Sequence, residues 1–176
     1  MSLNDAYYPD DAGQSPHTAL LGSEFIGWDE AAQTVTMRFT VKREMTTWRG
    51  GVQGGLVAGY LDDVMGYAYV AATGGEMAPL NLDLTMSLIR LIPEGPLIGK
   101  GRVVKAGKRV IFLEGELLAE DGTLHARATS TAIPTRLLLG SRSSPVSMAA
   151  WRSTPRAFPR CAPNSLRSAS LRSMRW

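Results

Sequence analysis

The sequence has few of the residues on which several kinds of functional site depend. It contains one cysteine, Cys161, and two histidines, His17 and His125, which lie far apart in the chain. A single cysteine excludes an internal disulfide and favours a reducing compartment, so we expect the protein in the cytoplasm. Neither histidine has a cysteine or another histidine at metal-ligand spacing, and no Ser–His or Cys–His pair is evident. We therefore expect no metal site and no cofactor.

Long apolar runs are also missing. No stretch of about 18 apolar residues occurs, so no transmembrane helix is expected. The first residues are polar and acidic, which does not match a secretory signal. With 176 residues and 44% hydrophobic side chains, the chain has enough apolar material for one packed domain.

Acidic residues and lysine are absent from residues 137–176, which carry seven arginines, whereas residues 1–136 carry 12 basic and 16 acidic residues. The formal net charge of +3 therefore comes from the tail. Because the tail is rich in Arg, Ser and Pro and lacks hydrophobic periodicity, we expect it to be disordered, and we expect residues 1–15 to be flexible.

Two other interpretations of the tail remain open. It resembles out-of-frame translation of a GC-rich gene end, and its arginines suggest an arm for nucleic acid or a membrane surface. Those arginines are scattered and lack interleaved aromatic residues, and the rest of the chain is mildly acidic. We therefore expect neither nucleic acid nor a membrane as a partner.

Hydrophobic periodicity in residues 16–136 predicts an α+β fold with one long helix and an antiparallel sheet. A short helix is expected at residues 15–22, and the long helix at residues 54–72. The predicted strands cover residues 25–28, 34–41, 80–91, 97–106, 110–119 and 124–133. Because the long helix is apolar on most sides, we expect a curved sheet to wrap around it.

A glycine cluster opens this helix, as Arg49-Gly-Gly-Val-Gln-Gly-Gly, and Asp62 follows two turns later. Glycine lets the backbone approach a ligand closely. The first turn of a helix has free N–H groups at the positive end of the helix dipole, which can stabilise a carbonyl oxygen as it becomes negative. Gly54 and Gly55 are therefore candidate oxyanion donors, with a tight turn before a close-packed helix as the alternative.

Asp62 is the candidate general base or nucleophile, with a solvated carboxylate as the alternative. It lies ~12 Å beyond Gly54 along the helix axis, too far for both groups to hold one carbonyl. This separation indicates a site shared between two antiparallel subunits. Asp63 is the second candidate; it lies about 100° around the helix and should face elsewhere.

The element order and the helix motif resemble the hotdog fold. Within that fold they resemble the acyl-CoA thioesterases of the phenylacetate-degradation type, which are related to 4-hydroxybenzoyl-CoA thioesterase. Those enzymes carry Asn-x-x-Gly-x-x-His-Gly-Gly, then six residues and an Asp. Gly50, Gly54, Gly55 and Asp62 stand at matching positions, whereas Gln53 replaces the His and Thr47 replaces the Asn. The resemblance covers roughly residues 18–135 and identifies residues 16–136 as a hotdog thioesterase domain.

This resemblance implies hydrolysis of an acyl-CoA thioester to free acid and CoA, with CoA as part of the substrate. A glycine N–H would stabilise the oxyanion, and the Asp of the neighbouring subunit would attack the carbonyl or activate a water. The chain should then form a dimer or a dimer of dimers. A non-catalytic acyl-CoA-binding hotdog protein is the alternative, and a hydratase ranks behind both because no His lies near the motif.

Several further side chains are candidates for contacts with the substrate. Gln53 can orient the carbonyl or a water but cannot act as a base, and helix capping is its alternative role. Thr47, Asn81 and Thr85 are predicted to contact the substrate, with an ordinary polar role as the alternative. The candidates for the CoA phosphates, each of which is otherwise a surface charge, are Arg90, Lys105, Lys108 and Arg109.

Overall fold

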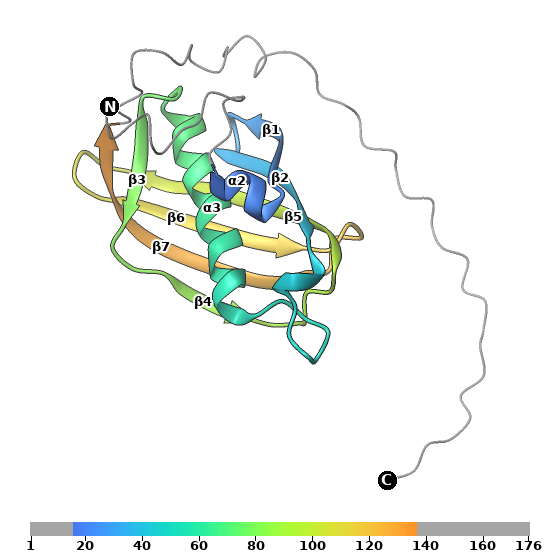
Figure 1. Ribbon diagram of the computed structural model, residues 1–176. Coiled ribbons are helices and arrows are strands. Elements are labelled where there is room, and N and C mark those ends of the chain that lie inside the picture. The colour runs from blue at the N-terminus through green and yellow to red at the C-terminus, as the bar shows by residue number, and fades with distance from the viewer. Residues whose placement is uncertain (1–15, 137–176) are drawn as a thin grey trace, which may run out of the picture.

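One long helix, α3 (Gly54–Ala72), lies in the concave face of a curled antiparallel sheet in the computed structural model, which describes residues 16–136 (Figure 1). The other helical elements are α2 (Pro16–Leu21) and the short 3-10 helix η1 (Arg43–Met45). The strands are β1 (Glu24–Asp29), β2 (Thr34–Val41), β3 (Met77–Asn81), β4 (Thr85–Leu88), β5 (Gly95–Ala106), β6 (Ile111–Leu118) and β7 (Leu124–Arg136).

This arrangement is the hotdog fold, so the predicted α+β class is confirmed. The strands follow the order β1-β2-β5-β6-β7-β3, and β4 also pairs with β7. The predictions of a flexible N-terminal segment and a disordered tail concern residues 1–15 and 137–176, which lie outside the described residues. Neither helix in residues 16–136 combines the length and apolar character needed to cross a membrane.

The single strand predicted at residues 80–91 is wrong, because the sheet edge is broken there. Asn81 lies opposite Ala132 and Thr85 lies opposite Thr129, so the edge uses one more residue than β7 between these pairs. The amides of Leu82 and Asp83 both donate to the carbonyl of Thr131, at 2.8 and 3.4 Å. In return, the Asp83 carboxylate accepts from the Thr131 amide at 3.0 Å. The extra residue forms a bulge that separates β3 from β4.

Helix α3 packs so closely on the sheet that it lies against main chain. Gly101 of β5 is opposite Gly115 of β6, and both underlie the helix. A Cβ on Gly101 would lie 2.1 Å from the carbonyl oxygen of Val64, and one on Gly115 would lie 3.0 Å from Cγ of Met65. These two positions therefore require glycine if α3 is to keep its distance from the sheet.

The core fills the remaining space between helix and sheet. Tyr60 of α3 meets Phe39 of β2 edge to face, with ring centroids 5.0 Å apart. Burial raises the pKa of the Tyr60 hydroxyl to about 12, and that hydroxyl donates to the sulfur of Met45 at 2.9 Å. One side of α3 is thus fixed against the sheet, and its other side is left for the site.

Candidate active site

Gln53 caps the start of α3. Its backbone is extended, and its side-chain oxygen accepts a hydrogen bond from the amide of Leu56 at 3.1 Å. A tight loop precedes it, in which Thr46 bridges to Val52 and the amide of Thr47 donates to the carbonyl of Gly51 at 2.8 Å. In the structure Gln53 therefore caps the helix, and its side-chain oxygen is already bound to the amide of Leu56.

The amides of Gly54 and Gly55 lie next to this cap, in the first turn of α3. The first turn of a helix has no intrahelical acceptor for its N–H groups, and within the described chain neither glycine amide donates to a loop or cap acceptor. Gly55 is exposed and Gly54 is half-buried. A Cβ on Gly55 would lie 2.9 Å from the side-chain oxygen of Gln53. Glycine at this position therefore keeps both the cap and an accessible amide.

Asp62 lies on the exposed side of α3, beside the broken edge of the sheet. The side-chain amide of Asn81, the last residue of β3, donates a hydrogen bond to Asp62 Oδ1. Asp62 is therefore not merely solvated: one of its oxygens is bound to a fixed neighbour. The structure brings together two residues that the sequence analysis treated separately, one as base and one as substrate contact.

Ser130 of β7 belongs to the same cluster and was missed from the sequence. Its hydroxyl lies 2.9 Å from Asn81 Oδ1 and 2.8 Å from the carbonyl of Asp83. It is buried, with 3% of its surface exposed. The signal that marks it is its position in an alternating row with Ala126, Ala128 and Ala132, where it is the one polar side chain.

Asp63 faces away from this cluster, as its place around the helix predicts. Its Oδ1 lies 3.0 Å from Nε2 of His17, and its Oδ2 accepts from Ser23 Oγ at 2.8 Å. Burial raises the pKa of the Asp63 carboxyl, and the hydrogen bond from Ser23 and the neighbouring His17 partly oppose this rise. Asp63 thus attaches α2 to α3 and is no second candidate for the base.

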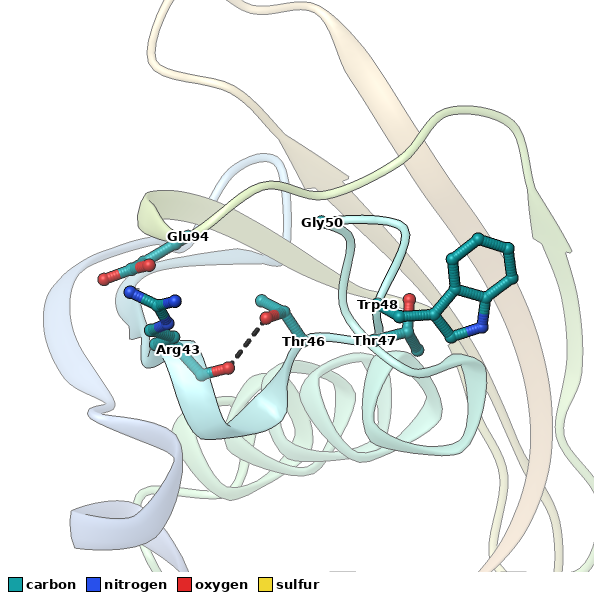
Figure 2. Close-up of a pocket in the computed structure, with 6 residues that line it drawn as sticks. All are labelled: Arg43, Thr46, Thr47, Trp48, Gly50 and Glu94. Carbon is teal, nitrogen blue, oxygen red and sulfur yellow. Dashed lines mark hydrogen bonds between the residues drawn. The ribbon is translucent and has the colours of Figure 1, made fainter.

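Thr47 lies at an open cavity of about 500 Å³ beside the start of α3. Figure 2 shows its lining residues, with the Arg43 and Glu94 side chains facing each other and the Trp48 ring directed to the other side. Trp48 is 89% exposed. The Thr47 hydroxyl donates to the carbonyl of Gly51 at 3.1 Å, so it shapes the loop. This cavity lies at η1 and the loop that precedes α3, and neither Gly54 nor Gly55 lines it.

The other predicted substrate contacts are spread along the sheet. Thr85 is exposed at the start of β4. Arg90 donates to the carbonyl of Leu124 at 2.8 Å, where β7 begins. Lys108 and Arg109 are exposed on the turn between β5 and β6, at the opposite end of the sheet from Arg90. Within one chain, the basic residues therefore do not converge on a single phosphate site.

The side of α3 that faces away from the sheet is lined with small residues. A Cβ on Gly59 or Gly66 would meet nothing within 4 Å. The neighbouring edge formed by β3, β4 and the segment after them carries a row of exposed apolar side chains, namely Leu80, Leu82, Leu88, Ile89 and Leu91. An open helix face and an apolar, unpaired sheet edge thus flank Asp62 together.

No group of three or more His, Cys, Asp or Glu side chains in residues 16–136 is arranged to hold a metal ion. His125 lies within the sheet at the start of β7, and His17 is engaged with Asp63. The candidate site therefore consists of two glycine amides, one carboxylate, and the Asn81–Ser130 pair.

The comparisons with known proteins concern the family and the fold. The thioesterase superfamily model matches residues 50–126, which run from the glycine loop to β7. A phenylacetic acid degradation-related protein of Ralstonia eutropha JMP134 is similar at 28% identity and a TM-score of 0.63, over 70% of this chain and 93% of that one. None of the curated proteins compared with the chain matches it.

Two more distant structures share the fold. The PaaI protein of the E. coli phenylacetic acid degradation operon has 20% identity and a TM-score of 0.59, over 66% of this chain and 86% of that one. A thioesterase of Haemophilus influenzae has 14% identity and a TM-score of 0.62, over 80% and 95%. Together with the wrapped helix, these similarities show that the chain has the hotdog fold, and its residues 50–126 match the thioesterase superfamily.

Proposed function

We propose that the chain is an acyl-CoA thioesterase that hydrolyses its substrate to free acid and CoA at a site shared by two copies. The match of residues 50–126 to the thioesterase superfamily supports thioester hydrolysis in general. The observation that carries the finer proposal is the position of Asp62: exposed on α3, bound to Asn81, and two turns from the free amides of Gly54 and Gly55.

The shared site follows from a symmetry argument. Asp62 lies ~12 Å along the axis from Gly54, so one thioester cannot contact both within one chain. In a two-fold dimer with antiparallel helices, Gly55 of one copy faces Asp62 of the other, and the axis passes between Ala58 and Gly59. That midpoint lacks bulky side chains, and a Cβ on Gly59 would meet nothing within 4 Å. The small residues thus lie where two helices would need to approach most closely.

The sheet edge supports the same dimer. Leu80, Leu82 and Leu88 are each more than half exposed on a short, unpaired edge beside α3. Soluble proteins seldom leave such an edge uncovered, because it invites pairing with another strand. A second copy would bury these side chains and bring its own helix alongside.

The chemistry of the proposed site has two parts. The amide of Gly55 or Gly54 donates to the carbonyl oxygen as negative charge develops there. Asp62 of the facing copy either takes a proton from the attacking water or attacks the carbonyl itself. The carbon–sulfur bond then breaks, and the thiolate of CoA leaves and takes up a proton. Where Asp62 itself has attacked, the acyl group is held as a mixed anhydride, and a water hydrolyses this anhydride to the free acid and restores the carboxylate. The reaction needs no cofactor, because CoA is part of the substrate.

The remaining candidates fit the periphery of this site. The cavity beside Thr47 lies at the loop that precedes α3 and offers room for part of the substrate. Arg90, Lys108 and Arg109 are exposed cations suited to the phosphates of CoA. Arg90 lies at one end of the sheet, and Lys108 and Arg109 lie at the other. We therefore propose that two copies of the chain each contribute cations that contact the phosphates of one CoA. The single cysteine favours a reducing compartment, the cytoplasm, as the place of action.

The test is thiol release from a panel of short, medium, long and aromatic acyl-CoAs by the full chain. Asp62→Asn should lower kcat by about 10²- to 10⁴-fold, the range for loss of a general base. Asp63→Asn is the matched control: it makes the same change one residue later, where the side chain contacts His17 and Ser23 instead. That variant should hydrolyse the substrate at close to the wild-type rate.

A non-catalytic acyl-CoA-binding protein is the second candidate. It is favoured by one observation, that Gln53 stands where related thioesterases carry His and uses its side-chain oxygen for the helix cap. Tight acyl-CoA binding without thiol release from any member of the panel would support this function over hydrolysis. Full activity of Asp62→Asn would remove Asp62 from the mechanism.

A further inference from the structure

Ser130 breaks the pattern of the strand that carries it. Along β7, the side chains at positions 126, 128, 130 and 132 face α3 and are buried. Three of them are alanine, and the fourth is Ser130 with 3% of its surface exposed. Burial of a hydroxyl costs free energy unless it forms hydrogen bonds, so a serine in an alanine row needs partners. Its partners are Asn81 Oδ1 at 2.9 Å and the carbonyl of Asp83 at 2.8 Å.

We propose that Ser130 is a positioning residue of the thioesterase site: by binding Asn81, it holds the Asp62 carboxylate in its working orientation. This inference rests on the proposed function. Ser130 does not touch the substrate in this scheme. It acts through a chain of hydrogen bonds that runs from Ser130 on β7 through Asn81 on β3 to Asp62 on α3.

The donors and acceptors in this series of hydrogen bonds are fixed by the chemistry of the carboxylate. A carboxylate only accepts hydrogen bonds, so Asn81 must present its NH₂ end, and not its oxygen, to Asp62. The amide oxygen then points the other way, where the Ser130 hydroxyl donates to it. The terminal torsion of an Asn side chain has broad minima, so the amide turns easily without such a partner. Ser130 thus fixes which end of the amide faces Asp62.

The bulge in the sheet edge brings this chain of bonds within reach. Asp83 and Thr131 hold the extra residue of the edge against β7, and the carbonyl of Asp83 is the second acceptor of the Ser130 hydroxyl. The Asn81 bond uses Asp62 Oδ1 and leaves the lone pairs of the other oxygen for a water or the thioester carbon. The bulge in the sheet edge therefore helps to place Asn81 and Ser130 so that they can orient Asp62.

Ser130→Ala in the full chain is the decisive variant, because it completes the alanine row and leaves no cavity larger than a hydroxyl. A purely structural role predicts a loss of stability, because two acceptors lose their donor, with little change in turnover. The positioning role predicts that kcat falls about tenfold, the effect of losing roughly one hydrogen bond in the transition state, while KM changes little. Thr129→Ala is the matched control, since it removes an exposed hydroxyl from the opposite face of the same strand.

A double-mutant cycle with Asn81→Ala tests the route of the effect. If Ser130 acts through Asn81, then Ser130→Ala causes no further loss of kcat once Asn81 is alanine. An equal loss in both backgrounds would overturn the inference, and so would a Ser130→Ala variant with wild-type kcat. A crystal structure of Ser130→Ala should show the Asn81 amide turned away from Asp62, and an unmoved amide would count against the role.

The inference and the proposed function fail in different ways. If the wild-type chain hydrolyses no acyl-CoA in the panel, the thioesterase proposal falls and the role of Ser130 falls with it. If the wild type is active and Ser130→Ala is equally active, only the role of Ser130 is overturned.

Discussion

Replacing Gly101 by alanine tests whether the spacing between α3 and the sheet holds the site together. The added Cβ would lie 2.1 Å from the carbonyl oxygen of Val64 and 2.6 Å from its carbonyl carbon. Both are main-chain atoms in the middle of a buried helix, so no side chain can turn aside to make room. An ordinary contact needs about 3.4 Å, so α3 must retreat by roughly 1 Å or more.

The size of the effect follows from that displacement. A gap of 0.5–1 Å removes about a quarter to a half of the dispersion energy of each contact across it, and Leu61, Val64 and Met65 all pack across this boundary. Insertion of a methyl group into a filled core costs about 1–3 kcal/mol, and a collision with main chain belongs at the top of that range. Alanine regains up to about 1 kcal/mol from the lower entropy of the unfolded chain. We therefore expect a net loss of about 2 kcal/mol.

Chemical denaturation and thermal melting at one protein concentration measure this loss. About 2 kcal/mol corresponds to a fall in Tm of about 10 °C for a domain of this size. Gly27→Ala is the matched control, because Gly27 lies in β1 and a Cβ there would meet nothing within 4 Å. It should match or slightly exceed wild-type stability.

The same variant links packing to function. Asp62 is on α3 and Asn81 is on the sheet edge, so a retreat of the helix should lengthen their hydrogen bond and lower kcat. A Gly101→Ala protein with a wild-type Tm and a wild-type kcat would refute the reasoning. Such a result would mean that the helix and the sheet can accommodate an added methyl group without loss of packing.

Two further predictions concern the open face and the buried carboxylate. Gly59→Leu should keep the fold, since a Cβ there meets nothing within 4 Å, but it should prevent the proposed dimer from forming, as measured by light scattering, and abolish thiol release. A dimeric, active variant would contradict the shared site. Asp63 has its pKa raised by burial, so its protonated form is favoured in the fold and its stability contribution is lost as pH rises through the folded pKa. The Tm of Asp63→Asn relative to wild type should therefore be higher at pH 7 than at pH 4, and a difference that is constant or reversed with pH would oppose this account.

The regular elements of the fold could be predicted because their patterns are local. The helix bounds at residues 54–72 and the strand at residues 34–41 agree with the structure, since alternation and helical spacing report directly on which side chains face a core. The hotdog resemblance rests on the element order and on the motif of Gly50, Gly54, Gly55 and Asp62, and the superfamily match supports it.

The broken edge was not predictable from the same kind of pattern. Apolar side chains alternate at Leu82, Leu84, Met86 and Leu88, as in one continuous strand. The break depends on hydrogen bonds exchanged between Asp83 and Thr131, which is 48 residues away in sequence. Periodicity contains no information on such distant partners.

Only part of the candidate site could be predicted, because some of its contacts also join residues that are distant in sequence. Asp62 and the glycines stand in a recognisable motif, whereas Ser130 becomes meaningful only when β7 is placed beside β3. The contacts by which Asp63 holds α2 could likewise be seen only in the folded structure. Helical geometry alone did predict that the Asp63 side chain points in a different direction from Asp62.

The different directions of Asp62 and Asp63, about 100° apart around the helix, constrain how the length of the chain can vary. Each helical residue turns by about 100°, so one residue inserted or deleted between Gly55 and Asp62 would rotate the whole second half of α3 by that angle. Asp62 would leave Asn81, Asp63 would leave Ser23, and Val64 would turn off the sheet at the same time. The helix is therefore intolerant of indels throughout this stretch. Changes of length belong instead in surface turns such as those at Gln33 and Gly122, where positive φ angles mark sharp bends between strands.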